Sequence, residues 1–142
     1  MNQLIIYTDG GSRGNPGPAA IAAVIGSKTY AEYIGEATNN EAEYRAIIFA
    51  LKKAKQLLGK KKIKNTEVIV NSDSELVVNQ LNGKFKILHP ELGPFFITIW
   101  NLKFDFPRLK FKYIPREQNK LADRLVNEVL DKYERSQSLS FS

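Results

Sequence analysis

The sequence predicts a single α/β domain, and three observations support this prediction. Apolar runs short enough for strands, separated by glycine-containing turns, fill residues 4–37. Longer stretches with helical periodicity follow over 41–58 and 118–133, with further strand-like runs between them. A chain of 142 residues, 43% of them hydrophobic, can bury one core without disulfides. We therefore expect one domain over 1–133 and a C-terminal tail over 134–142.

The first three elements are predicted strands joined by short connections. Residues 4–7 form an apolar, β-prone run that ends in a glycine-rich turn, as a buried strand does. Residues 19–25 are small and apolar, residues 29–37 alternate more loosely, and Gly26 and Ser27 supply a tight turn between them. Consecutive strands with such short connections predict an antiparallel meander.

Helix signals dominate the rest of the chain. Residues 38–40 suit a helix start, the periodic pattern over 41–58 predicts the helix, and Gly59 is expected to end it. The remaining predictions are a strand over 67–71, a short helix over 74–81, a helix over 90–104 that Gly93 and Pro94 split, a strand over 109–114 and an amphipathic helix over 118–133. The tail is expected to be disordered, the alternative being that Leu139 and Phe141 dock on an exposed sheet edge.

Charge and composition narrow the classes of function. Because the chain has no cysteine, disulfides and thiolate metal sites are excluded. The net charge of +6 and the pI near 9.5 favour a polyanionic partner. The sequence has no signal-peptide pattern and no apolar run of about 18 residues, so we expect a cytoplasmic protein with no membrane partner.

Four acidic residues occupy positions where a carboxylate is costly. Asp9 and Asp73 each follow an apolar strand, at the sheet edge where α/β proteins bind ligands. Glu43 and Asp123 each begin the apolar face of a predicted helix. These faces continue through Ile47, Leu51, Ala54 and Leu58 after Glu43, and through Val126, Leu130 and Tyr133 after Asp123. Carboxylates gathered at one point would repel one another unless cations compensate them.

We therefore predict two divalent cations, Mg²⁺ first and Mn²⁺ as a substitute, because oxygen ligands favour hard ions. Two such ions would activate a water on one side of a phosphodiester and stabilise the leaving oxygen on the other. Each acid also has a structural explanation: the strand-end aspartates can be caps, Glu43 can be a first-turn acid favoured by the helix dipole, and Asp123 can pair with Arg116 or Arg124. A single metal site explains all four acids on converging elements better than four separate structural roles do.

The segments that carry these acids resemble ribonuclease H of the type 1 family. They span residues 9–17, 38–43, 72–74 and 115–123, and the similarity covers residues 3–133 in family order. The resemblance implies a five-stranded mixed sheet, three antiparallel strands and then two parallel ones, flanked by helices. It also implies an endonuclease that cleaves the RNA strand of an RNA/DNA hybrid and leaves 5′-phosphate and 3′-hydroxyl ends. A monomer is expected, with double-stranded RNA as a further candidate ligand.

By position, the resemblance makes the four acids, Asp9, Glu43, Asp73 and Asp123, the metal-binding catalytic residues. It assigns contacts with the hybrid to Gly10, Gly11, Asn15, Thr38, Asn39, Asn40 and Ser74. Thr38 matches a position that holds a DNA phosphate. Amide side chains and backbone groups lining a minor groove can donate to and accept from 2′-hydroxyls, which agrees with RNA specificity. The alternative for Asn39 and Asn40 is helix capping.

The sequence departs from the family pattern in two places. Many relatives carry a histidine in the loop before the last acid, whereas this loop offers Arg116 and Asn119 as auxiliary residues, the alternative for Arg116 being a plain surface arginine. The sole histidine, His89, precedes Pro90 and is expected to cap or pack. Residues 83–89 are too few for the basic protrusion with which many relatives grip the hybrid, so we predict a compact form.

Another surface must then supply affinity for a hybrid. The candidates are Lys52, Lys53, Lys55, Lys60, Lys61, Lys62 and Lys64, the alternative being a solvated helix face. Three other functions compete with a ribonuclease: a related metal-dependent nuclease with a different nucleic-acid substrate, a non-catalytic hybrid-binding module, and a purely structural domain. Four repelling acids are hard to explain in the last two.

Overall fold

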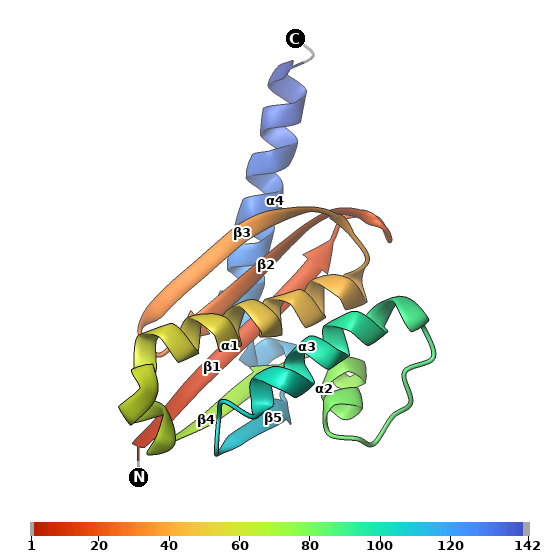
Figure 1. Ribbon diagram of the computed structural model, residues 1–142. Helices are drawn as coiled ribbons and strands as arrows, with labels where there is room; N and C mark the ends of the chain where they lie inside the picture. Colours follow the sequence, from red (N-terminus) through yellow and green to blue (C-terminus); the bar gives the residue numbers. More distant parts are fainter. Residues whose placement is uncertain (1, 141–142) are drawn as a thin grey trace.

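A computed structural model describes residues 2–140, which form a five-stranded mixed sheet with helices on both faces (Figure 1). The strands are β1 (Asn2–Ser12), β2 (Gly17–Ile25), β3 (Lys28–Ala37), β4 (Thr66–Ser72) and β5 (Leu109–Tyr113), in the spatial order β3-β2-β1-β4-β5. Strands β1, β2 and β3 pair antiparallel, whereas β4 pairs parallel with both β1 and β5. The predicted sheet, a meander followed by two parallel strands, is confirmed.

The helices divide between the two faces of the sheet. One face is covered by α1 (Asn39–Lys64), α2 (Glu75–Leu81) and α3 (Gly93–Lys103), and the other by α4 (Lys120–Ser140) (Figure 1). Short 3₁₀ turns, η1 (Pro90–Leu92) and η2 (Arg116–Gln118), precede α3 and α4. No helix in residues 2–140 combines the length and the apolar character needed to cross a membrane.

Strand β2 lies between two hydrophobic cores. Ala23 and Ile25 face the larger core, which includes Tyr44 and Ile47 of α1. Ala20, Ala22 and Val24 face the smaller core, where they meet Ala122, Val126 and Leu130 of α4. Because side chains alternate along a strand, the small apolar run predicted from the sequence serves both helical layers, and its alanines leave room for α4 to approach the sheet closely.

Helix α1 is interrupted at the predicted position. Gly59 adopts a φ of 71° and ends the first helical segment as predicted, and a second helical segment that was not predicted then runs to Lys64. This lysine-rich end lies beside the start of β1, where the Asn2 N–H donates to the Asn65 carbonyl at 3.2 Å. The predicted restart of a helix near Gly93 is confirmed, since α3 begins there after η1.

The C-terminal helix is longer than predicted. It continues to Ser140, so the expected helix end near Tyr133 and the expected disorder of the residues after it are wrong through that point. Tyr133 stacks on Tyr33 of β3, with ring centroids 4.3 Å apart, and Figure 1 shows α4 projecting past the β3 edge of the sheet. Leu139 is 73% exposed rather than docked on a sheet edge, and Phe141 lies outside the described residues. The division at residue 133 stays a prediction, although the helix crosses it without a break.

Candidate active site

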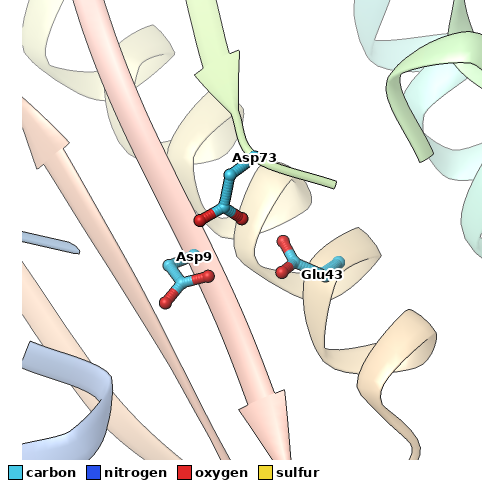
Figure 2. A group of neighbouring side chains, drawn as sticks. All are labelled: Asp9, Glu43 and Asp73. Atoms are coloured by element: carbon cyan, nitrogen blue, oxygen red, sulfur yellow. The ribbon is translucent and has the colours of Figure 1, made fainter. Parts of the chain in front are cut away.

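Three of the predicted acids meet at one point. Asp9 lies in β1, Glu43 in the second turn of α1 and Asp73 directly after β4, and one carboxylate oxygen from each lies within 4.8 Å of the others. Figure 2 shows the three side chains converging from these separate elements. Asp9 and Glu43 are only 6% and 8% exposed. An acidic cluster this buried differs from the exposed acidic groups that are common on protein surfaces.

The sheet register and one glycine bring these acids together. Strands β1 and β4 are parallel with Thr8 opposite Ser72, so Asp9 and Asp73 come next to each other where β4 ends. The expectation that the first strand also ends before Asp9 is wrong, because β1 continues to Ser12 in its pairing with β2. Gly10 then lets α1 approach: a Cβ built on it would lie 2.3 Å from the carbonyl carbon of Ala42. Both glycines that are predicted to contact a hybrid, Gly10 and Gly11, line the cleft over the acids. At Gly10 the close neighbour is the backbone of α1, whereas a Cβ built on Gly11 would meet Val126 at 3.5 Å.

The carboxylates of the cluster resist ionising together. Burial, followed by the nearby charge of Asp73, raises the pKa of Asp9 from 3.8 to about 7. Burial and then the Asp9 charge raise the pKa of Glu43 well above its usual value. Burial also raises the pKa of Asp73, against the opposing effects of Asn119 and Arg116. Among the described residues, the buried Glu43 Oε2 has no hydrogen-bond partner.

These features fit a divalent cation. Carboxylate oxygens of three residues lie within 4.8 Å of one another, and the carboxylate of Glu43 includes a buried, unpartnered oxygen. Together they form an anionic oxygen site of the kind that Mg²⁺ and Mn²⁺ bind. A cation there would satisfy the orphaned oxygen and favour the ionised form of all three acids.

The fourth predicted acid, Asp123, lies outside this group of three. It lines the same cleft from the first turn of α4, its side chain is 33% exposed, and its Oδ1 lies 3.6 Å from Nη2 of Arg116. One of the two predicted alternatives, an ion pair with Arg116, is therefore present, while Arg124 instead lies near Glu128. Asp123 still contributes to raising the pKa of Asp9, which places its charge within reach of the cluster.

The glycine-rich turn and the start of α1 are tied together by asparagines. The Ser12 N–H donates to Asn39 Oδ1 at 2.9 Å, and the Asn39 N–H donates to Asn15 Oδ1 at 3.0 Å. Thr38 provides the cap of α1, accepting from the Glu41 N–H at 3.2 Å, so capping by Asn39 or Asn40 is wrong. Asn39 thus fixes the turn against the helix, and Asn39 and Asn40 both line the cleft.

Four further predicted residues have distinct surroundings. Ser74 caps α2 through Val77 N–H and also lines the cleft. Asn119 is 2% exposed and donates to the Thr8 carbonyl at 2.9 Å, which anchors the loop before α4 next to β1. Arg116 is 79% exposed. His89 directly precedes η1 but makes no side-chain cap bond, and its ring is exposed and lies 3.7 Å from Glu91, so the predicted capping and the predicted packing are both wrong.

Arg13 and Asn127 are cleft residues for which the sequence analysis predicts no role. Arg13 belongs to the glycine-rich turn, and Asn127 lies on the helix that carries Asp123. Its position one helical turn after Asp123 was the available signal, since residues four apart share a helix face. Both residues line the cleft.

The raised pKa values predict how stability depends on pH without metal. A folded-state pKa above the unfolded value means that folding favours the protonated acid, so this stability is present below about pH 4 and is lost as pH rises through about 7. For Asp9 alone the loss is on the order of a few kcal/mol. In chelator, the melting temperature of the wild type should fall over this range relative to that of Asp9→Asn, and Mg²⁺ should reverse the fall near neutral pH. If the melting temperatures of the two proteins changed with pH by the same amount, the raised pKa of Asp9 would be contradicted.

A family model described as reverse transcriptase-like matches residues 7–129 of the chain. The fold superposes with a TM-score of 0.87 on the structure of an RNase H1 isolated from compost by a metagenomic approach, which is 47% identical, over 94% of this chain and 99% of that one. The same compost enzyme in complex with an RNA/DNA hybrid gives a TM-score of 0.86 at 47% identity, over 92% and 98% of the two chains.

Similar curated proteins include longer chains. The bifunctional protein Rv2228c of Mycobacterium tuberculosis is 40% identical over 136 residues, which cover 91% of this chain and 36% of that protein. The ribonuclease HI of Halobacterium salinarum is 37% identical over 131 residues, 88% of this chain and 63% of that protein. The chain therefore spans about a third of the first relative and under two thirds of the second.

Proposed function

Because this chain belongs to the reverse transcriptase-like family and has the ribonuclease H fold, we propose that it is a ribonuclease H, an endonuclease that hydrolyses the RNA strand of an RNA/DNA hybrid. The observation that carries the proposal is the buried group Asp9, Glu43 and Asp73, in a chain 47% identical to an RNase H1 whose structure contains a hybrid. Release of 5′-phosphate and 3′-hydroxyl ends is part of the proposal.

We assign the holding of two divalent ions, Mg²⁺ with Mn²⁺ as a substitute, to the three clustered acids together with Asp123. When bound, such ions supply the positive charge that acidifies an attacking water and stabilises the leaving oxygen. The fold keeps the acids close together and largely shielded from water. A bound cation, rather than a proton, then balances their negative charge. Arg116, near Asp123 and exposed to the cleft, is the proposed auxiliary residue in place of a histidine.

The glycine-rich turn and the start of α1 form the proposed substrate surface. Among the predicted substrate-binding residues, those that line the cleft beside the acids are Gly10, Gly11, Asn39, Asn40 and Ser74. Their amides, hydroxyl and backbone groups can sense 2′-hydroxyls, which distinguish the RNA strand from DNA. Asn15 acts through its bond to the Asn39 N–H, and Thr38 by fixing the first turn of α1.

The lysine-rich end of α1 is a poor candidate for gripping the hybrid at this site. It lies beside Asn2 at the start of β1, whereas Asp9 is seven residues along the strand, about 23 Å away. The solvated-face interpretation of these lysines is therefore favoured for a substrate centred on the acids.

The test is cleavage of one labelled RNA strand paired with DNA, beside the same RNA alone and paired with RNA, in Mg²⁺, Mn²⁺ or chelator. We expect metal-dependent cutting of the hybrid with 3′-hydroxyl products, and the RNA duplex arm decides whether double-stranded RNA is also a substrate. Tight hybrid binding without any cutting would contradict the proposal and favour a binding module. Size-exclusion chromatography with light scattering tests the predicted monomer.

A further inference from the structure

Two side chains lie next to the Asp123 carboxylate, and they differ in how firmly their own positions are fixed. Among residues 2–140, its Oδ1 lies 3.6 Å from Arg116 Nη2 and 3.3 Å from Asn127 Nδ2. The Arg116 side chain is 79% exposed, so water screens that contact. Asn127 is half-buried one turn further along α4, and its Nδ2 also donates to the Asp123 carbonyl at 3.0 Å. Asn127 is therefore the neighbour with a fixed position.

Arg13 determines which way the Asn127 amide points. Its Nη2 lies 3.2 Å from Asn127 Oδ1 and 3.4 Å from the Asn127 carbonyl oxygen. A guanidinium group only donates, so the amide oxygen must face Arg13 and the amide N–H groups are left for Asp123. In the reverse orientation, the Asn127 amide N–H groups would face the N–H groups of Arg13, and the amide oxygen would face the Asp123 carboxylate, so neither contact would be a hydrogen bond.

Arg13 is itself fixed by two acids of α4. Its Nη2 lies 2.7 Å from Asp131 Oδ1, and its Nη1 lies 2.9 Å from Glu134 Oε1. Its own position in the chain, between β1 and β2, ties this group to the glycine-rich turn. Steps of four, four and three residues lead from Asp123 to Asn127, Asp131 and Glu134, so a single stripe of α4 faces this arginine.

We propose that Asn127, oriented by Arg13, is a positioning residue that holds the Asp123 carboxylate ready for the divalent cation. The inference rests on the proposed ribonuclease function, because it takes Asp123 as a metal ligand. A carboxylate that is already oriented loses less side-chain freedom on binding a cation, and hydrogen-bonded outer groups of this kind affect metal affinity strongly. The same contacts also hold the glycine-rich turn against α4, the helix that carries Asp123.

The test measures Mn²⁺ binding to the protein without nucleic acid, by calorimetric titration. Asn127→Ala should weaken Mn²⁺ binding about tenfold to a hundredfold. In the background of Asp123→Asn, the same change should have no further effect, because the group through which Asn127 acts is gone. Glu128→Ala is the matched control, since Glu128 is the next residue on α4, is exposed and faces Arg124, and we expect unchanged affinity.

Arg13→Ala provides a second variant. Releasing the amide of Asn127 should weaken Mn²⁺ binding, and combining the change with Asn127→Ala should weaken it no further than Asn127→Ala alone. Melting curves in chelator establish that each variant is folded. Equal Mn²⁺ affinity of the wild type and Asn127→Ala overturns this inference and leaves the proposed function intact. An effect of Asn127→Ala that persists in Asp123→Asn also overturns it, and a wild type that binds no Mn²⁺ overturns the proposed function as well.

Discussion

Asp9→Asn should abolish hybrid cleavage, lowering the rate on the order of a thousandfold or more, while the chain stays folded. The amide keeps the size of the side chain, but it removes a charged oxygen ligand from the centre of the cluster. Because Asp9 is 6% exposed and repelled by its neighbours, the same change should raise the melting temperature in chelator near neutral pH.

The measurement is hybrid cleavage by the wild type and Asp9→Asn in Mg²⁺, with melting curves of both in chelator. Asp105→Asn is the matched control, an identical change at an exposed acid that pairs with Lys55 at 3.0 Å, and it should cleave normally. Normal turnover by Asp9→Asn would remove Asp9 from the catalytic assignment.

Gly10→Ala should destabilise the chain by more than about 3 kcal/mol or prevent folding. The added Cβ would lie 2.3 Å from both the carbonyl carbon and the carbonyl oxygen of Ala42, and 2.6 Å from the Glu43 nitrogen. These are backbone atoms of α1, so the clash cannot be relieved by rotating a side chain, and α1 would have to move away with Glu43.

Gly11→Ala is the control for this prediction. Its Cβ would meet Val126 at 3.5 Å, which is ordinary van der Waals contact, so its stability should stay within about 1 kcal/mol of the wild type. Chemical denaturation of the three proteins decides the question. If Gly10→Ala were as stable as Gly11→Ala, the close contact between β1 and α1 would be wrong.

Each acid at the centre of the site could be placed on its element because the patterns that reveal apolar runs and helix faces are local. Asp9 and Asp73 both end apolar runs, and the parallel pairing of β1 with β4 brings the ends of these runs together. Glu43 followed from helical spacing, since a residue that begins an apolar stripe must face the sheet.

Other parts of the site depend on contacts between distant segments. The orientation of Asn127 depends on Arg13, which lies 114 residues away, and no periodicity reports such a pair. The close packing of α1 on Gly10 is likewise not predicted, because the path of α1 across β1 cannot be derived from the turn itself.

The length of α4 was missed for a similar reason. The alternation of serine with glutamine and leucine after residue 135 resembles a disordered end. The preceding turns are nevertheless held by the ion pairs of Asp131 and Glu134 with Arg13 and by the stacking of Tyr133 on Tyr33. A helix already fixed this way propagates more easily than it starts, so it continues to Ser140.

Anomalous diffraction from crystals grown with Mn²⁺ shows whether the clustered acids bind metal, because it locates the metal independently of activity. We expect Mn²⁺ bound by carboxylate oxygens of Asp9, Glu43 and Asp73, with Asp123 available to a second ion. Crystals saturated with Mn²⁺ that show no metal at these acids, from a protein that still cleaves hybrids, would contradict it.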